Sequence, residues 1–198
     1  MRIVLSDFIS LDGVVQAPGG KKEDTDGGFA HGGWSMRYFD EEAMGPFFDE
    51  AMKETDALLF GRRTWQTMAA AWPGRSGDPF ADHMNAIKKY VASRTLSQED
   101  LTWTNSHLLP PDDALGAIAK LRTEDGRDVH VMGSSDLARQ LISNDLVDEY
   151  RLMIEPVVLG GGKRLFPEDG TLRGLELVST TLSKTGVHIC TYRPPSTS

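Results

Sequence analysis

The stretch Leu58-Leu59-Phe60-Gly61-Arg62-Arg63-Thr64-Trp65 predicts a short buried strand that ends in a tight turn and then enters a helix. Gly61 lets the backbone turn tightly, and the first turn of the helix offers free backbone N–H groups. The two arginines add fixed positive charge beside those groups. In a chain whose formal net charge is −8, a cationic turn at the carboxyl end of a strand indicates a site for an anionic small molecule.

The composition limits the kind of protein. The chain has 198 residues, which suits one domain spanning residues 1–198, and 39% of them are hydrophobic. The acidic balance argues against a general binder of nucleic acid or of membrane surfaces, because both need a basic field. No apolar run reaches the roughly 18 residues of a membrane span, and we find no secretory signal. Cys190 is the only cysteine, so no intrachain disulfide can form, and we expect a cytoplasmic protein.

Strands and helices alternate along most of the chain. We expect strands at residues 2–10, 57–60, 89–93, 101–108, 128–132 and 149–159. We expect helices at residues 39–55, 64–71, 110–122 and 135–142. Pro156 interrupts the last strand of the first set, and Pro46 marks either the start of the first helix or a kink in it.

Two further strands, at residues 175–182 and 187–192, flank Gly186 and should pair antiparallel. The whole order predicts an α/β fold with a mostly parallel central sheet flanked by helices and an antiparallel C-terminal hairpin. Residues 17–34 are rich in glycine and lack periodicity. Long loops of this kind are often lids or binding loops, so we expect this one to shape the substrate side of a site.

Three of the expected strands end in turns suited to anionic ligands. The turns are residues 61–64, Ser93-Arg94-Thr95 and Gly133-Ser134-Ser135-Asp136. In open α/β sheets ligands bind at the carboxyl ends of parallel strands, so one ligand with separated phosphates could bridge the three turns. A dinucleotide with an additional 2′-phosphate fits best, with its pyrophosphate at helix starts and arginines at the extra phosphate.

Each of these turns also has an ordinary interpretation. Arginine after a strand is usually a solvated surface residue, and Gly-Ser-Ser before a helix is more often a cap, with Ser134 or Ser135 as the N-cap residue. Only the placement of the three turns together favours a nucleotide site.

Other common chemistries lack their motifs. The five histidines show no metal-binding spacing such as H-E-x-x-H, so we expect no metal. The chain has no G-x-S-x-G nucleophile elbow, and the G-x-G-x-x-G fingerprint of Rossmann domains is absent as well. The run Gly160-Gly161-Gly162-Lys163-Arg164 lacks the earlier glycine of a Walker A loop.

Several motifs occur in order over nearly the whole chain: Ser10-Leu11-Asp12-Gly13, residues 61–64, Ser93-Arg94, Gly133-Ser134 and the stretch 155–162. As a set they resemble the dihydrofolate reductase superfamily, and more closely the reductase domain of the bifunctional riboflavin-biosynthesis deaminase/reductase. The resemblance implies a dihydrofolate reductase-like fold, NADPH as cofactor, hydride transfer as chemistry, and a homodimer. It implies cofactor contacts from Gly61, Arg62, Arg63, Thr64, Ser93, Arg94, Gly133, Ser134, Ser135, Gly160 and Gly161, although the last two also suit a flexible turn.

The chain departs from those enzymes in ways that leave the substrate open. It carries no zinc motif of the deaminase domain, and no Pro-Trp precedes its first helix, where dihydrofolate reductases have the carboxylate that grips the pteridine. Residues 17–34 also make a longer loop than the compact riboflavin enzyme has.

Four residues are candidates for the substrate side, each with a plainer alternative. Asp12 would be the catalytic residue, orienting the substrate or relaying a proton, or it is simply part of an Asp-Gly turn. Trp34 would stack on a flat ring or plug the sheet, and Phe48 would line a pocket or pack in the core. Glu155 ends a buried strand, where it would contact the substrate or pair with an arginine.

Together these observations predict an NADPH-dependent reductase that transfers hydride to a C=N or C=O bond of a small, heterocyclic substrate resembling a pterin or a pyrimidine. The alternative is a non-catalytic nucleotide- or ligand-binding protein that retains the reductase fold. Neither interpretation has nucleic acid or a membrane as a partner.

Overall fold

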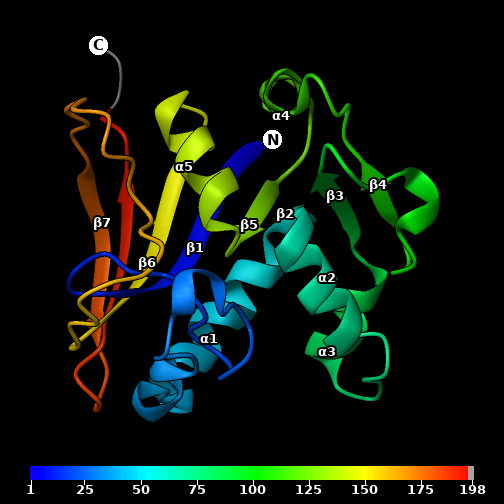
Figure 1. Cartoon of the computed structure of the whole chain (residues 1–198). Helices are drawn as coiled ribbons and strands as arrows, with labels where there is room; N and C mark the ends of the chain where they lie inside the picture. The colour runs from blue at the N-terminus through cyan, green and yellow to red at the C-terminus, as the bar shows by residue number, and fades with distance from the viewer. Residues whose placement is uncertain (196–198) are drawn as a thin grey trace.

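One sheet organises the fold (Figure 1). The computed structural model describes residues 1–195, and the strands in that part form an eight-stranded sheet in the order β4-β3-β2-β5-β1-β6-β8-β7. The strands are β1 Arg2–Ser10, β2 Thr55–Gly61, β3 Lys88–Ala92, β4 Ser106–Leu108, β5 Asp128–Met132, β6 Glu149–Glu155, β7 Glu176–Leu182 and β8 His188–Arg193. Neighbours from β4 through to β6 pair parallel, whereas β8 pairs antiparallel with both β6 and β7. The expected α/β fold with an antiparallel C-terminal hairpin is confirmed.

The helices lie on the two faces of this sheet. They are α1 Glu41–Lys53, α2 Arg62–Ala71, α3 Pro79–Ala86, α4 Ala114–Leu121 and α5 Ser135–Ser143. Helices α4 and α5 cover one face, where Ile118 and Leu141 pack with Leu5 of β1. Helices α2 and α3 cover the other face, where Trp65 packs with Phe60 of β2, and α1 reaches the same layer. Within residues 1–195, none of these helices is long and apolar enough to span a membrane.

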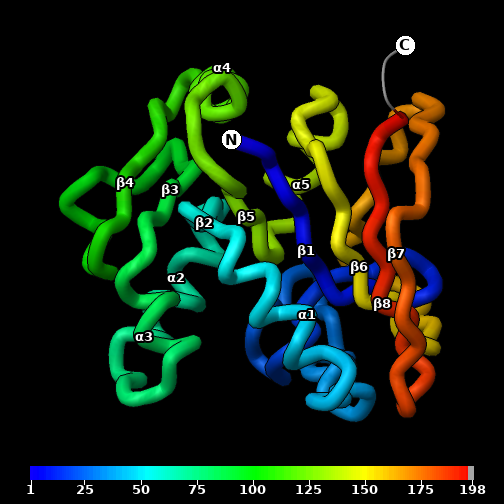
Figure 2. Tube along the Cα trace, turned by 180° about the vertical axis from the view of Figure 1, so that it is seen from behind, coloured from blue at the N-terminus to red at the C-terminus, as the bar shows by residue number. Residues whose placement is uncertain are grey.

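β1 occupies the middle of the sheet between β5 and β6, as Figure 2 shows from behind. It is buried on both faces, which is typical of a central parallel strand with an almost continuous apolar sequence. Its register with β5 ends at Ser6 and Met132, whereas its register with β6 continues to Ser10 and Glu155. In the described part of the chain, β1 therefore has no paired strand on its β5 side beyond Ser6.

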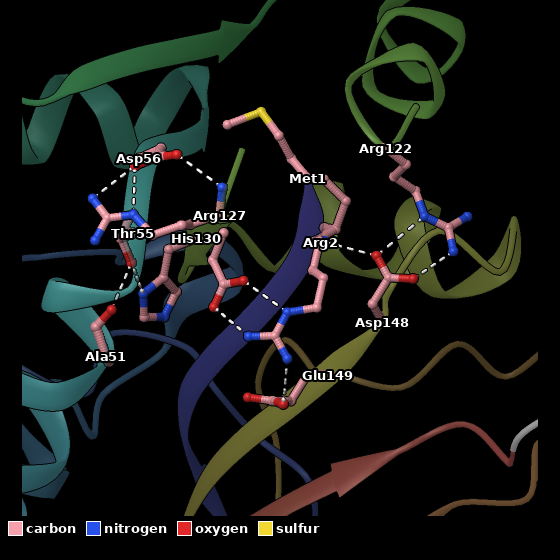
Figure 3. Close-up of polar contacts among 12 residues, drawn as sticks. Met1, Arg2, Ala51, Thr55, Asp56, Arg122, Arg127, His130, Asp148 and Glu149 are labelled. Carbon is pink, nitrogen blue, oxygen red and sulfur yellow. Dashed lines mark hydrogen bonds and ion pairs between the residues drawn. The ribbon is translucent and has the colours of Figure 1, made fainter. Parts of the chain in front are cut away.

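At the amino ends of the central strands, charged side chains are paired with one another (Figure 3). Arg2 Nε lies 2.8 Å from an oxygen of Asp128 and Nη1 lies 3.4 Å from an oxygen of Glu149. Arg151 and Arg193 also donate to Glu149, at 2.6 and 2.8 Å. Burial raises the pKa of Glu149, but the hydrogen bonds from Arg193 and Arg151 outweigh that effect and hold it below its ordinary value. The negative charges in this region are thus compensated inside the protein.

Helix α3 is an element that the sequence analysis missed. Its local signals are nevertheless ordinary: the Asp78 side chain accepts a hydrogen bond from the backbone N–H of Phe80, and Pro79 stands in the first turn. Helix α1 begins at Glu41, because Asp40 caps it, so Pro46 lies inside the helix and not at its start. β6 ends at Glu155, directly before the proline expected to interrupt it.

The strand expected at residues 101–108 is confirmed only at β4. Trp103 packs in the core, where its ring stacks on Phe60 with the centroids 6.1 Å apart. The buried ammonium group of Lys89 donates to the carbonyl groups of Ile87 and Thr104, at 2.7 and 3.0 Å. Side-chain contacts therefore replace strand pairing before β4.

Candidate active site

A cleft of about 1120 Å³ opens at the carboxyl ends of β1, β2, β3 and β5. Its lining includes the three turns that the sequence analysis singled out, residues 61–64, 93–95 and 133–136. Residues 15–19 and 22–26 and Lys163 line it as well. The structure therefore brings the three turns together in one site, because the carboxyl ends of neighbouring parallel strands meet at the same edge of a sheet.

A hydrogen bond joins the first and third turns. The backbone N–H of Gly61 donates to Oγ of Ser134 at 2.9 Å, which links the end of β2 to the end of β5. Gly133 and Ser134 have φ angles of 62° and 64°, both left-handed. A Cβ atom at Gly133 would also lie 3.5 Å from the methyl group of Thr64. Left-handed backbone at a non-glycine residue such as Ser134 is uncommon, and such residues cluster at ligand sites.

The two helices that begin at these turns start without a side-chain cap. Gly61 stands at the N-cap of α2 and has no side chain to offer. Ser134 stands at the N-cap of α5, as expected, but its hydroxyl group accepts from Gly61 and makes no capping bond. Uncapped helix starts present free N–H groups and the positive end of the helix dipole to an anion.

The second turn exposes an arginine. Ser93 Oγ accepts hydrogen bonds from the backbone N–H groups of Thr95 and Leu96, at 3.1 and 3.0 Å, which fixes a tight turn after β3. Arg94 is exposed on that turn and lines the cleft. Of the arginines in the three turns, the one that forms an ion pair within residues 1–195 is Arg63. Arg62 and Arg94 thus keep their charges for another partner.

The glycine-rich loop lies against the cleft through acidic residues. Lys163 Nζ lies 2.5 Å from Asp24 and 2.9 Å from Asp26, and Asp26 also forms the ion pair with Arg63. The amide group of Gln16 donates to the carbonyl groups of Asp24 and Asp26, at 3.2 and 3.1 Å. The loop is therefore fastened to one of the cationic turns by its own carboxylates.

The sequence analysis missed a buried acid in this cleft. Asp7 is 5% exposed, lines the cleft, and its Oδ2 has no hydrogen-bond partner among the described residues. Burial raises the pKa of Asp7 well above its ordinary value, and the negative charge of Glu23 raises it further, while the backbone N–H of Phe8 acts in the opposite direction. One feature of the sequence could have identified Asp7 as a candidate site residue. It is a carboxylate inside an otherwise apolar strand, and the apolar pattern of a buried strand does not account for it.

Apolar rings and a thioether also line the cleft. Phe8, Phe48 and Met153 all line it, and the rings of Phe8 and Phe48 lie 6.0 Å apart. The structure thus places Phe48 in the cleft wall as well as against the core cluster of Met153 and Met44.

Asp12 lies elsewhere. It lines a second, smaller hollow near Phe166, and not the cleft. Its oxygens accept hydrogen bonds from Ser10 Oγ and from the backbone N–H groups of Leu159 and Gly160, at 2.7, 3.0 and 2.9 Å. Partial burial raises the pKa of Asp12, but these hydrogen bonds outweigh it and lower the pKa to about 2. Asp12 is therefore a turn residue that fastens the chain after β6, and its placement does not support the catalytic role expected for it.

Four other expected site residues also lie outside the lining of the cleft. Gly160 and Gly161 are exposed beside Asp12, so their placement does not support contact with a cofactor. Trp34 is buried, and its ring N–H donates to the carbonyl group of Gln16 at 2.8 Å. The side chain thus joins the two ends of the glycine-rich loop.

Glu155 is fully buried behind the loop and does not line the cleft. Its Oε1 accepts from Ser35 Oγ at 2.5 Å, so its partner is a hydroxyl group and not the expected arginine. Burial raises the pKa of Glu155 to about 7, against a lowering effect of the Ser35 hydrogen bond.

Comparison with known proteins agrees with this architecture. Residues 2–189 match the sequence profile of the RibD C-terminal domain. The uncharacterized protein YyaP of Bacillus subtilis strain 168 is 31% identical over 191 residues, which cover 94% of this chain and 91% of that protein. YwjB of the same strain, also uncharacterized, is 24% identical over 168 residues, covering 84% of this chain and 83% of that one.

Two solved structures share the fold. A putative riboflavin biosynthesis protein from Shewanella sp. PV-4 superposes with a TM-score of 0.74 at 18% identity, covering 98% of this chain and 99% of that one. A pyrimidine reductase-like protein from Corynebacterium diphtheriae superposes with a TM-score of 0.63 at 15% identity, covering 99% and 92%. The fold is thus that of the riboflavin-type, dihydrofolate reductase-like proteins, as expected. The chain belongs to the RibD C-terminal domain family, and this membership supports a reductase-like function.

Proposed function

We propose that this protein is an NADPH-dependent reductase that transfers hydride to a C=N or C=O bond of a small, heterocyclic substrate of the pterin or pyrimidine type. The observation that carries the proposal is the meeting of three turns, two of them uncapped helix starts and one with an exposed arginine, in one cleft.

The residues of the cleft fit this cofactor. A volume of about 1120 Å³ exceeds that of most small-ligand pockets, which span roughly 300–1,000 Å³, and leaves room for a dinucleotide beside a substrate. Residues 61–64 and 133–135 would hold the pyrophosphate with backbone N–H groups. Arg62 and Arg94, which keep their charges free, would hold the 2′-phosphate. NADPH bound there would supply the hydride.

The apolar part of the cleft suits a flat ring. Phe8, Phe48 and Met153 would pack on a heterocycle and exclude water from it, and Asp7 is a polar group of the same cleft. The names of the two structural neighbours, a putative riboflavin biosynthesis protein and a pyrimidine reductase-like protein, point to the same class of substrate.

Titration with NADPH and with NADH, followed by cofactor fluorescence, tests the proposal. We expect NADPH to bind more tightly than NADH, and Arg94→Ala to weaken NADPH by about tenfold to a hundredfold, because a charge-assisted hydrogen bond contributes about 1.5–3 kcal/mol. Arg75→Ala is the matched control, since Arg75 is exposed and stacks on Trp72 outside the cleft.

Absence of binding by either nucleotide would contradict the proposal. Binding of NADPH without its oxidation, across dihydropterins, ribosylaminopyrimidines and quinones, would favour the non-catalytic alternative that keeps only the nucleotide site.

We further propose that the protein is a homodimer and works in the cytoplasm, where its buried free thiol, Cys190, would stay reduced. β7 is an edge strand whose residues are all exposed, and Leu177 and Leu182 are 55% and 63% exposed on it. A second copy would cover this edge. Light scattering should give a dimer for the wild type and a monomer for the double variant Leu177→Asp, Leu182→Asp; a wild-type monomer would contradict this.

A further inference from the structure

We propose that Asp7 is the acid of this cleft: its carboxyl group donates a proton to the substrate's nitrogen or oxygen as the adjoining carbon receives hydride. The inference rests on the proposed reductase function and adds to it the residue that completes the reaction.

The position of Asp7 is set by the place where two strands stop pairing. β5 ends its register with β1 at Ser6, one residue earlier, so Asp7 has no paired strand on its β5 side, and it lines the cleft. On its other side Asp7 stays paired in register with Leu152 of β6, which holds its backbone in the sheet. The backbone of this acid therefore belongs to a paired strand and not to a loop.

The surroundings of Asp7 favour its neutral, protonated form. The carboxyl group is buried, and Oδ2 has no donor within the described residues that would stabilise a negative charge. Lys163, a cation in the lining of the cleft, is held by Asp24 and Asp26. The loop contributes Glu23, whose charge opposes ionisation of Asp7. A protonated carboxyl group with an unused O–H is a proton donor at neutral pH.

The other acids of the region are occupied or misplaced. Asp12 accepts three hydrogen bonds and lies outside the cleft. Glu155 accepts from Ser35 through Oε1, and its Oε2 also has no partner among the described residues, but Glu155 does not line the cleft. Glu23 lines the cleft, but its Oε2 accepts from the backbone N–H groups of Gly19 and Gly20 at 2.8 and 3.0 Å. Among these acids Asp7 alone combines burial, a free oxygen and a place in the cleft wall.

The step balances with the groups named. As the carbon of a C=N bond accepts the hydride, the π electrons of that bond move to nitrogen, and nitrogen takes the proton from Asp7. The substrate is reduced to CH–NH and the dihydronicotinamide is oxidised. Asp7 is left as a carboxylate, which regains its proton from water when the product leaves.

Proton release on cofactor binding tests the placement of Asp7 without any substrate. The oxidised nicotinamide ring of NADP⁺ is positively charged and would lower the pKa of an adjacent acid, whereas the ring of NADPH is neutral. Calorimetry in two buffers of different ionisation enthalpy measures the protons released. We expect more release with NADP⁺ than with NADPH, and this difference cancels any contribution of the 2′-phosphate, which both nucleotides share.

Asp7→Asn should abolish that difference and leave NADPH binding intact, because a neutral amide replaces a neutral acid of the same shape. Glu155→Gln is the matched control, a buried acid outside the cleft, and should keep the difference. Asp7→Ser is a second variant should the first fail to fold. An unchanged difference in the Asp7 variants would overturn the proposal.

The rate of NADPH oxidation with a dihydropterin or ribosylaminopyrimidine probe supplies the second readout. With Asp7 as the acid, kcat/KM should fall about tenfold for each pH unit above the pKa of Asp7. Asp7→Asn should lower turnover by about 10²–10⁴-fold and flatten this profile. Wild-type turnover in Asp7→Asn would overturn the role of Asp7 while leaving the reductase standing, whereas failure of NADPH to bind the wild type would remove the reductase itself.

Discussion

The two ends of the sheet treat charge in opposite ways. At the amino ends of the central strands, the buried carboxylates of Asp128 and Glu149 are each 2% exposed and are paired with arginines, as Figure 3 shows for Arg2 and Glu149. At the carboxyl ends, Asp7 is also buried, but within residues 1–195 one of its oxygens has no partner and the exposed Arg94 forms no ion pair. Burial of charge by itself therefore does not mark a functional site. What separates the two ends is whether the buried or charged group already has its partner.

The paired charges at the amino end therefore stabilise the fold, whereas charged groups at the carboxyl end are able to bind a ligand. Substitutions at the amino end should change the free energy of unfolding and leave the nucleotide site alone. Substitutions in the cleft should do the reverse.

The largest effect should come from acidification acting on His130, whose ring lies between Ser6 Oγ and Thr55 Oγ1, at 2.6 and 3.4 Å. Burial, reinforced by the charge of Arg151, lowers the pKa of His130 from 6.5 to about 3. Because the folded pKa lies below the unfolded one, this contribution is fully present above pH 6.5 and is lost as pH falls toward 3. The free energy of unfolding should fall by about 1.4 kcal/mol per pH unit in that window from this group.

Urea unfolding at several pH values checks this prediction. His130→Gln, which can keep one hydrogen bond but does not titrate, should remove that part of the slope. Equal slopes for the variant and the wild type would show that His130 does not carry the effect.

The next largest effect should follow from Arg151→Met at the amino end. Its guanidinium group donates to Glu149 at 2.6 Å and lies 3.7 Å from Asp128. Removal of one partner from a buried ion pair costs about 3–5 kcal/mol, and we expect about 2 kcal/mol here because Arg2 and Arg193 still pair with Glu149. NADPH affinity should stay unchanged. Arg37→Met, at an exposed position, is the control. A loss of NADPH binding in Arg151→Met would contradict the expectation that the amino end affects stability alone.

A smaller effect on stability is expected from Asp12→Asn. Asp12 lies toward the carboxyl ends of the strands, but both of its oxygens already accept hydrogen bonds. We therefore expect Asp12, like the paired charges at the amino ends, to affect stability and not nucleotide binding. An amide can accept through one oxygen only, so loss of a hydrogen bond from Leu159 or Gly160 should cost about 1 kcal/mol. NADPH binding and oxidation should be unaffected in a cofactor titration and a rate assay. A large fall in turnover would return Asp12 to the catalytic role first expected for it.

The smallest effect should come from Asp26→Asn in the glycine-rich loop. Asp26 holds Arg63 and Lys163. Because exposed ion pairs contribute about 0.2–1 kcal/mol, freeing these cations should tighten NADPH by about twofold to fivefold, and less at high salt. Asp125→Asn, at an exposed position outside the cleft, is the control. Weaker NADPH binding in Asp26→Asn would mean that the loop carboxylate helps to form the site and does not compete with phosphate.

Much of the fold could be predicted because its signals are local. β1 and β5 were expected at residues 2–10 and 128–132, and both are confirmed at those bounds, since an apolar run flanked by charged residues marks a buried strand. The three turns were found because glycine, serine and arginine directly follow such runs. Their meeting in one cleft then follows from the parallel order of the strands.

The rest could not be predicted because it depends on residues far apart in the chain. The sequence pattern places Asp7 in an apolar strand, and its access to the cleft depends on where β5 stops pairing. The sequence leaves Asp12 as either a catalytic or a turn residue, because its backbone partners, Leu159 and Gly160, lie 147 and 148 residues away along the chain. Local patterns identify what a residue is able to do, whereas its partners decide what it does.

The hydrogen bond from Gly61 to Ser134 has a consequence for the thermodynamics of binding. It holds two turns that are 73 residues apart in the chain in a fixed relation before any ligand arrives. Conformational entropy that a flexible site would lose on association has then already been lost in folding. The binding enthalpy of a phosphate at these turns would therefore be little offset by ordering of the protein, and Ser134→Ala should weaken binding mainly through a less favourable entropy.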